Sequence, residues 1–202
     1  QGEVGAWNFA RLLESISPLM EEPKLLHEAL DSYYESYRGH SSHMWAQKLG
    51  LDGFQEGDGD LVSELTSVMQ LTETDMTILF RTLSTIQEPD SNHLTRAFYK
   101  EEEIPQKEWN SWLDRWWSRV DGRPDRESML NANPKYVLRN WIAQLAIDAA
   151  EKEDYSVATA LYEMLKKPYD EQPGNEEKWF SRRPEWARTV SYTHLTLPTT
   201  WS

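Results

Sequence analysis

The sequence of 202 residues contains no cysteine. Within these residues, this absence excludes disulfide bonds, zinc sites built on thiolates and a cysteine nucleophile. Long hydrophobic runs are missing too, because no apolar run approaches the roughly 18 residues that a membrane-spanning helix needs. The first residues have neither a basic start nor a long apolar core, so they do not form a secretory signal.

Basic residues are scarce: 21 Lys and Arg stand against 34 Asp and Glu, which gives a formal net charge of −13. Such an acidic chain repels the phosphates of nucleic acids and of anionic lipids. The composition therefore predicts neither a nucleic-acid partner nor a membrane partner. The catalytic and phosphate-binding patterns HExxH, GxSxG, GxxxxGK[ST] and GxGxxG are also absent.

Apolar and aromatic residues are plentiful, at 39% and 12%, and ten of the residues are Trp. This composition predicts a folded protein with a real core. Apolar residues recur at spacings of three and four, and no β-type alternation longer than a few residues occurs before Ser191. We therefore predict an all-α fold, an irregular bundle of about seven helices. The chain lacks an initiator Met and begins in a helix-like pattern, so we expect it to start inside a longer protein.

Residues 133–150 carry the clearest helix pattern. Asn133 is a suitable N-cap, and Pro134 fits the first helical position. One wide apolar face is formed by Val137, Leu138, Trp141, Ile142, Leu145, Ala146 and Ala149. The pattern predicts a buried central helix around which the rest of the chain is built.

Two helices are predicted before residue 51, and they should form an antiparallel hairpin. The first is indicated by the spacing of Trp7, Ala10 and Leu13 and should end near Pro18. The second should begin at Pro23, weaken or kink at Gly39 and end at Gly50. Further helices are expected at about residues 61–69, 76–83, 105–120, 129–130 and 156–165. A reciprocal cap of Thr72 and Asp75 should start the helix at 76–83, and residues 168–174 should be irregular and exposed.

The Gly- and Asp-rich loop at residues 51–60 is a candidate calcium site. A loop numbered from Asp52 puts Phe54 at a ligand position and Ser63 where a bidentate Glu belongs. A loop numbered from Asp58 puts Val62 at a ligand position. The spacing therefore favours a solvated loop over a calcium site.

Two further groups of residues have a functional and a structural interpretation. Lys135 and Arg139 are four residues apart and could hold an anion near a helix start, but bonds to neighbouring carboxylates or carbonyls are favoured. His40 and His43 lack a carboxylate at the spacing of a metal triad, which favours a structural or solvent-facing role.

The spacing of Trp109, Trp112 and Trp116 places three indoles on one helix face. This row could stack sugars or bases, but packing is favoured. From the residues alone, no catalytic, cofactor-binding or metal-binding residue is assigned.

Several longer stretches resemble the carboxy-terminal region of the selenoprotein O family. They are residues 133–156 (NPKYVLRNWIAQLAIDAAEKEDYS), 165–173 (LKKPYDEQP), 183–187 (RPEWA), 1–19 (QGEVGAWNFARLLESISPL), 44–51 (MWAQKLGL) and 76–84 (MTILFRTLS). The resemblance extends from Gln1 to about Val190. Lys167 occupies a position where the family usually has Asn.

The resemblance implies a part of a protein adenylyltransferase with a protein-kinase-like fold. Members of the family are expected to bind ATP with Mg²⁺ or Mn²⁺ and to transfer AMP to Ser, Thr or Tyr hydroxyls of proteins. Their nucleotide-handling groups lie upstream of the segment that matches Gln1, so no catalytic, cofactor or metal residue carries over to this chain. The resemblance also implies a cytoplasmic location in a bacterium, or a mitochondrial one in a eukaryote.

Two functions are therefore considered. In the first, residues 1–190 support the missing amino-terminal catalytic lobe by burying Trp-rich helix faces against it, and are inactive alone. In the second, they form a stand-alone helical interaction module that binds a partner through the face of residues 109–117. The last residues, 191–202, are unrelated in composition and lack the family's terminal Cys or selenocysteine, so we expect a disordered or artefactual tail.

Overall fold

A computed structural model describes residues 2–20, 22 and 24–188 of the chain. These residues form nine α-helices and four 3-10 helices, with one isolated bridge between Thr74 and Phe98. The all-α prediction is confirmed, with more helices than the seven expected. The chain divides into two compact units, Gln1–Ala46 and Gln47–Ser202, and each is described by itself. The predicted tail at 191–202 lies outside the described residues.

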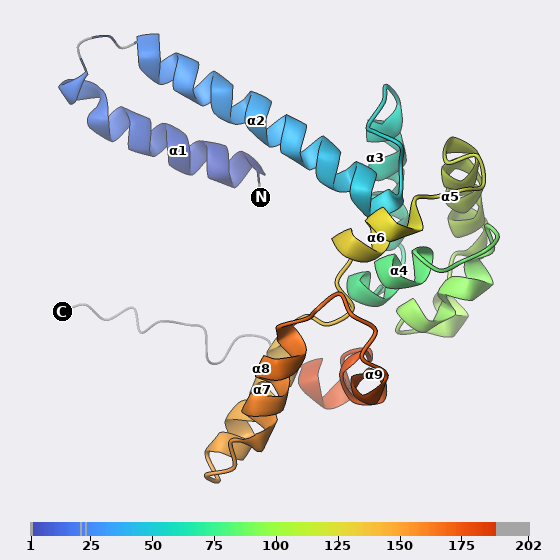
Figure 1. Ribbon diagram of the computed structural model, residues 1–202. Helices are drawn as coiled ribbons and strands as arrows, with labels where there is room; N and C mark the ends of the chain where they lie inside the picture. Colours follow the sequence, from blue (N-terminus) through green and yellow to red (C-terminus); the bar gives the residue numbers. More distant parts are fainter. Residues whose placement is uncertain (1, 21, 23, 189–202) are drawn as a thin grey trace. The chain divides into compact units, whose positions relative to one another are not determined.

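The first unit contains α1 (Gly2–Ile16), η1 (Ser17–Leu19) and all but the last three residues of α2 (Lys24–Leu49), which form the predicted antiparallel hairpin (Figure 1). The Tyr33 hydroxyl donates to the Gly2 carbonyl at 3.2 Å, and the Tyr33 ring lies 5.6 Å from the Phe9 ring. Among the residues whose spacing predicted α1, Leu13 is buried and Trp7 is exposed.

Helix α2 passes through Gly39 as a single element, so the predicted weakening or kink is not found. A glycine inside a helix costs only about 1 kcal/mol relative to alanine. That cost is too small to break a helix of 26 residues.

The core of the second unit is built on the Trp row of α5 (Gln106–Arg119), where Trp109, Trp112 and Trp116 are buried. The Trp112 indole N–H donates to the Leu61 carbonyl of α3 (Asp58–Met69) at 2.9 Å, and that of Trp116 donates to the Leu49 carbonyl at 2.8 Å. The rings of Trp112 and Trp116 stack with centroids 5.9 Å apart. The packing interpretation of this row is confirmed.

Helix α4 (Met76–Leu83) packs on η2 (Ser91–Ala97) and on α6 (Arg126–Ala132). Its predicted apolar face is buried, namely Ile78, Leu79, Phe80 and Leu83. Asp75 alone caps it, accepting from the Ile78 N–H at 3.0 Å. The predicted participation of Thr72 is wrong, because its buried hydroxyl has no hydrogen-bond partner among the described residues.

The predicted central helix at 133–150 is the largest error. Helix α7 comprises only Asn140–Ala150, and on it only Trp141 and Ile142 are buried. Residues 136–139 have no regular structure. The predicted inward residues Val137 and Leu138 are exposed.

Tertiary hydrogen bonds hold the non-helical segment before α7. The N–H groups of Lys135 and Tyr136 both donate to the Pro168 carbonyl, at 2.8 and 3.0 Å. The Asn133 side chain does not cap a helix; it donates to the Lys48 carbonyl and accepts from the Lys48 ammonium, both at 2.9 Å. These partners satisfy the polar groups of the segment in a non-helical conformation.

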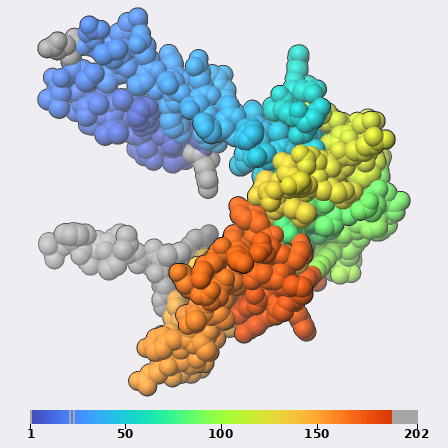
Figure 2. All heavy atoms as spheres, viewed as in Figure 1, coloured from blue at the N-terminus to red at the C-terminus, as the bar shows by residue number. Residues whose placement is uncertain are grey.

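Helix α7 pairs with α8 (Ser156–Leu165), and this hairpin projects from the rest of the second unit (Figures 1 and 2, orange). The chain then runs through residues 168–172 into α9 (Pro173–Trp179), a helix that the sequence pattern did not predict. Two short 3-10 helices, η3 (Glu101–Glu103) and η4 (Glu185–Arg188), complete the described elements.

We predict that Gly50→Ala lowers the free energy of unfolding by about 1–3 kcal/mol, the range for a side chain forced into the left-handed region. Gly50 ends α2 with φ +65°, and an added Cβ would lie 2.8 Å from the Met129 sulfur and 2.9 Å from the Asp125 nitrogen. Urea denaturation measures the change. Gly59→Ala, in α3 and with nothing within 4 Å, is the matched control. An equal loss in both variants would contradict this explanation.

Candidate functional site

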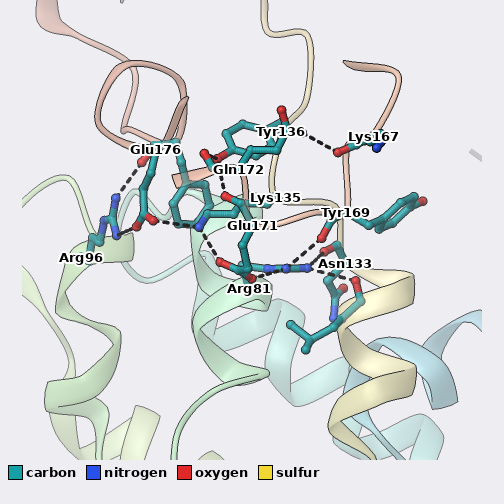
Figure 3. Close-up of polar contacts among 12 residues, drawn as sticks. Arg81, Arg96, Asn133, Lys135, Tyr136, Lys167, Tyr169, Glu171, Gln172 and Glu176 are labelled. Carbon is teal, nitrogen blue, oxygen red and sulfur yellow. Dashed lines mark hydrogen bonds and ion pairs between the residues drawn. The ribbon is translucent and has the colours of Figure 1, made fainter. Parts of the chain in front are cut away.

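Arg81 is a buried arginine and the only charged residue of helix α4. Its guanidinium donates to the carbonyls of Leu130 and Asn133 at 3.0 Å each, and to that of Tyr169 at 2.9 Å (Figure 3). It also pairs with the Glu171 carboxylate at 2.5 Å. One side chain thus joins α4, the end of α6 and the segment before α9.

Lys135 lies beside Arg81 and is also buried (Figure 3). Its ammonium pairs with Glu171 at 2.7 Å and with Glu176 of α9 at 2.9 Å. The Tyr136 hydroxyl donates to the Glu171 carbonyl at 2.8 Å. These five residues, Arg81, Lys135, Tyr136, Glu171 and Glu176, are called the Arg81–Lys135 network below.

The network shifts the pKa values of its members. Burial opposes the charge on Lys135, but its hydrogen bonds to Glu171 and Glu176 outweigh burial and raise the pKa of the ammonium. The hydrogen bond from Lys135 lowers the pKa of both Glu171 and Glu176, with further help from Arg81 at Glu171 and from Arg96 at Glu176. All three groups are therefore held in their charged forms.

A second ion pair, between Asp75 and Arg139, lies at the start of α4. The Arg139 guanidinium binds the Asp75 carboxylate in two places, at 2.5 and 2.9 Å, and also donates to the Ser181 carbonyl at 2.9 Å. Beside this pair is a cavity of about 310 Å³. It is lined by Thr74, Asp75, Met76, Thr77, Tyr99, Arg139, Asn140, Trp141, Arg183 and Ala187, and is called the Asp75 cavity below.

Lys135 and Arg139 therefore bond to different carboxylates, as the favoured interpretation predicted. They do not share a helix face, because residues 136–139 are not helical. The roles of Arg81 and Glu171 were not predicted from the sequence. An arginine inside an apolar helix was the available signal, since a buried charge needs partners.

The Asp-rich loop at residues 51–60 is held by Arg119, so the prediction of a solvated loop is only partly right. Arg119 pairs with Asp58 at 2.8 Å and with Asp52 at 2.9 Å, and it donates to the Gly53 carbonyl at 2.9 Å. Asp58 is buried, whereas Asp52 is exposed. The hydrogen bond from Arg119 lowers the pKa of Asp52.

The described residues contain no group of three or more His, Cys, Asp or Glu side chains placed to hold a metal ion. His40 and His43 are exposed, in keeping with a solvent-facing role, and the His40 ring lies 2.7 Å from the Ser36 carbonyl of its own helix. None of the helices in the described part of the chain is long and apolar enough to span a membrane.

Fold and site together define a helical region stabilised by buried ion pairs, with no metal-ligand cluster among the described residues. Residues 1–166 match the family model described as "Protein adenylyltransferase SelO". The chain therefore belongs to the SelO family, as its sequence motifs indicated.

Curated relatives agree with this assignment. A protein nucleotidyltransferase YdiU from Flavobacterium johnsoniae is 45% identical over 200 residues, which cover 93% of this chain and 38% of the relative. YdiU proteins from Rhodopirellula baltica and Aromatoleum aromaticum are 39% and 38% identical, over 93% of this chain and 39% and 38% of the relatives. The chain thus spans about two fifths of the length of these bacterial relatives.

We predict that Arg81→Ala lowers the free energy of unfolding by about 3 kcal/mol, because it leaves three backbone carbonyls and the Glu171 carboxylate without their guanidinium partner. Chemical denaturation of the purified chain measures the loss. Arg115→Ala is the control, since Arg115 and its partner Glu64 are both about half exposed and such a pair contributes about 0–1 kcal/mol. Similar losses for the two variants would contradict a structural role for Arg81.

Stability should also fall in acid. Because the folded-state pKa values of Glu171 and Glu176 are lowered, their contribution is present above the unfolded pKa of about 4.3 and is lost as pH falls through the folded values. Urea midpoints from pH 7 to pH 3 test this, and Glu171→Gln should flatten the acidic limb. Glu177→Gln, at an exposed position of α9, should keep the slope of the unsubstituted chain.

Proposed function

We propose that this chain is part of a protein adenylyltransferase that transfers AMP from ATP to Ser, Thr or Tyr hydroxyls of other proteins, and that this part supports the catalytic lobe. Membership of the SelO family supports the reaction class. The described residues supply no set of metal ligands, so ATP and Mg²⁺ or Mn²⁺ would be held by the amino-terminal lobe of the whole protein. A cytoplasmic location is proposed from the bacterial relatives.

The observation that carries the supporting role is the exposed apolar surface of the α1–α2 hairpin. On α1, only Ala6 and Leu13 are buried, while Trp7 is 61% exposed. Other exposed apolar side chains of this unit are Val4, Leu12, Leu19, Leu25, Tyr34, Tyr37 and Met44. So many large exposed apolar side chains on one small unit are typical of a surface that binds another protein or another part of the same protein.

The covering part of the protein is proposed to be the amino-terminal lobe. The relatives are more than twice as long as this chain, so the complete protein has enough additional residues to cover the hairpin. Burial of such apolar side chains contributes about 25 cal/mol for each Å² removed from water. The hairpin would thereby bind the lobe that handles the nucleotide.

The Trp row of α5 does not bind the amino-terminal lobe in this proposal. Trp109, Trp112 and Trp116 are already buried in the core of the second unit. They can neither pack against a separate lobe, as the first hypothesis expected, nor offer the exposed binding face that the alternative module required. The exposed hairpin surface replaces them in the proposal.

We predict that Trp7→Ser lowers AMP transfer by the full-length protein at least about tenfold, while it changes the unfolding free energy of the 202-residue chain by no more than about 0.5 kcal/mol, as is usual for an exposed site. Transfer of label from ATP to a protein acceptor and thermal unfolding are the two measurements.

Tyr162→Ser is the control, because Tyr162 is 65% exposed on α8 of the second unit. Full activity of the Trp7 variant would contradict the role of the hairpin. AMP transfer by the 202-residue chain alone would contradict the proposed division between catalytic lobe and support.

A further inference from the structure

Residues 173–188, which contain α9 and η4, follow a strained residue and are called the α9–η4 segment below. Gln172, directly before them, has φ +41° and ψ +65°, in the left-handed region of the backbone. A residue with a side chain is strained in that region, and the strain persists only where surrounding contacts hold it. Release of the α9–η4 segment would relieve this strain, which makes Gln172 a suitable hinge.

Before Gln172, the chain is attached to the rest of the second unit through buried cations. The Glu171 carboxylate pairs with Arg81 and Lys135, whose side chains are 6% and 4% exposed. Dissolved salt screens pairs with a buried member much less than it screens exposed pairs. The chain up to Glu171 should therefore stay attached when the ionic strength rises.

After Gln172, most of the ion pairs are partly exposed. Arg96 of η2 pairs with Glu176 at 3.2 Å (Figure 3), and these side chains are 51% and 40% exposed. Glu73 pairs with Arg183 at 2.6 Å and with Arg188 at 3.2 Å, and the side chains of all three are 33–40% exposed. Because salt screens exposed pairs, these three attachments should weaken as the ionic strength rises.

Other contacts of the α9–η4 segment also depend on cations. Arg96 donates to the Phe180 carbonyl at 2.8 Å, and Arg139 donates to the Ser181 carbonyl at 2.9 Å. The Phe180 ring is buried, with the Arg96 guanidinium 4.8 Å and the Lys135 ammonium 5.2 Å from its centre. The buried apolar side chains of the segment are Trp179, Phe180 and Ala187.

Release of the segment would leave no buried cation without a carboxylate. Lys135 would lose Glu176 but keep Glu171, and Arg139 would keep its two bonds to Asp75. Arg96 is already half exposed, so water can replace its partners. The large cost of an unpaired buried charge therefore does not oppose this opening.

We propose that the α9–η4 segment is a salt-sensitive lid, which opens about Gln172 while the rest of the second unit stays folded. Such local opening of one contiguous part is common in folded proteins. Arg183 and Ala187 line the Asp75 cavity, so opening of the lid removes one wall of that cavity. This proposal does not depend on the AMP-transfer proposal.

Amide hydrogen exchange in the 202-residue chain tests the lid, because exchange of a protected N–H follows the opening of its segment. The reporter in the lid is the Arg183 N–H, which donates to the Tyr99 hydroxyl at 3.0 Å. The reporters outside the lid are the N–H groups of Tyr136 and Val120. They donate to the Pro168 carbonyl at 3.0 Å and to the Trp116 carbonyl at 3.1 Å.

The measurement compares about 0.1 M with about 1 M NaCl, where the Debye length is about 10 Å and about 3 Å. Each exposed pair favours the closed state by a factor of about 1.4 to 5, so screening of three pairs predicts about tenfold faster exchange at Arg183. Exchange at Tyr136 and Val120 should not follow this increase. Exchange at Arg183 that ignores salt or rises in step with Val120 would overturn the lid, and a matching rise at Tyr136 would overturn the hinge at Gln172.

Arg96→Gln removes a cation whose hydrogen bonds to Glu176 and Phe180 both lead to the lid. It should speed exchange at Arg183 at least about threefold in low salt and reduce the response to salt. Arg115→Gln is the matched control, because Arg115 is also half exposed but pairs with Glu64 of α3. Equal exchange at Arg183 in the two variants would overturn the proposal, as would a rise at Val120 that equals the rise at Arg183.

Discussion

The buried guanidinium of Arg81 is the interaction on which the second unit most depends. Four acceptors surround it: three carbonyls and the Glu171 carboxylate. Both terminal nitrogens of the guanidinium are paired, while its Nε has no partner among the described residues. A buried arginine needs such partners, because removing a charge from water costs several kcal/mol. The position of the chain before α9 and the end of α6 are both fixed by this requirement.

The segment at 133–139 follows from the same constraint. The N–H groups of Lys135 and Tyr136 donate to the Pro168 carbonyl, and the Asn133 side chain, which was expected to cap a helix here, is bonded to Lys48 instead. The extended path also brings the Lys135 ammonium to Glu171 and Glu176. Helix propensity is worth only a few tenths of a kcal/mol per residue, so these tertiary contacts decide the local structure.

The sequence was a good guide wherever the apolar pattern alone decides the structure. The Trp row of α5 and the buried face of α4 were predicted because their spacing of three and four leaves one packing direction. The start of α7 and the existence of α9 were not predicted, since both depend on partners distant in sequence. The bonding of Lys135 and Arg139 to carboxylates could be anticipated, but not the identity of Glu171 and Asp75, which only the fold brings near.

The distance along the chain between Arg81 and Glu171 has a consequence for how the protein is made. Ninety residues separate the two partners, and contacts between distant residues must overcome the entropy of closing a long loop before they stabilise anything. During synthesis, α4 leaves the ribosome long before the acceptors at residues 169 and 171 exist. The arginine of α4 must therefore stay hydrated in the nascent chain, and the second unit can complete its folding only after nearly all of its residues have emerged.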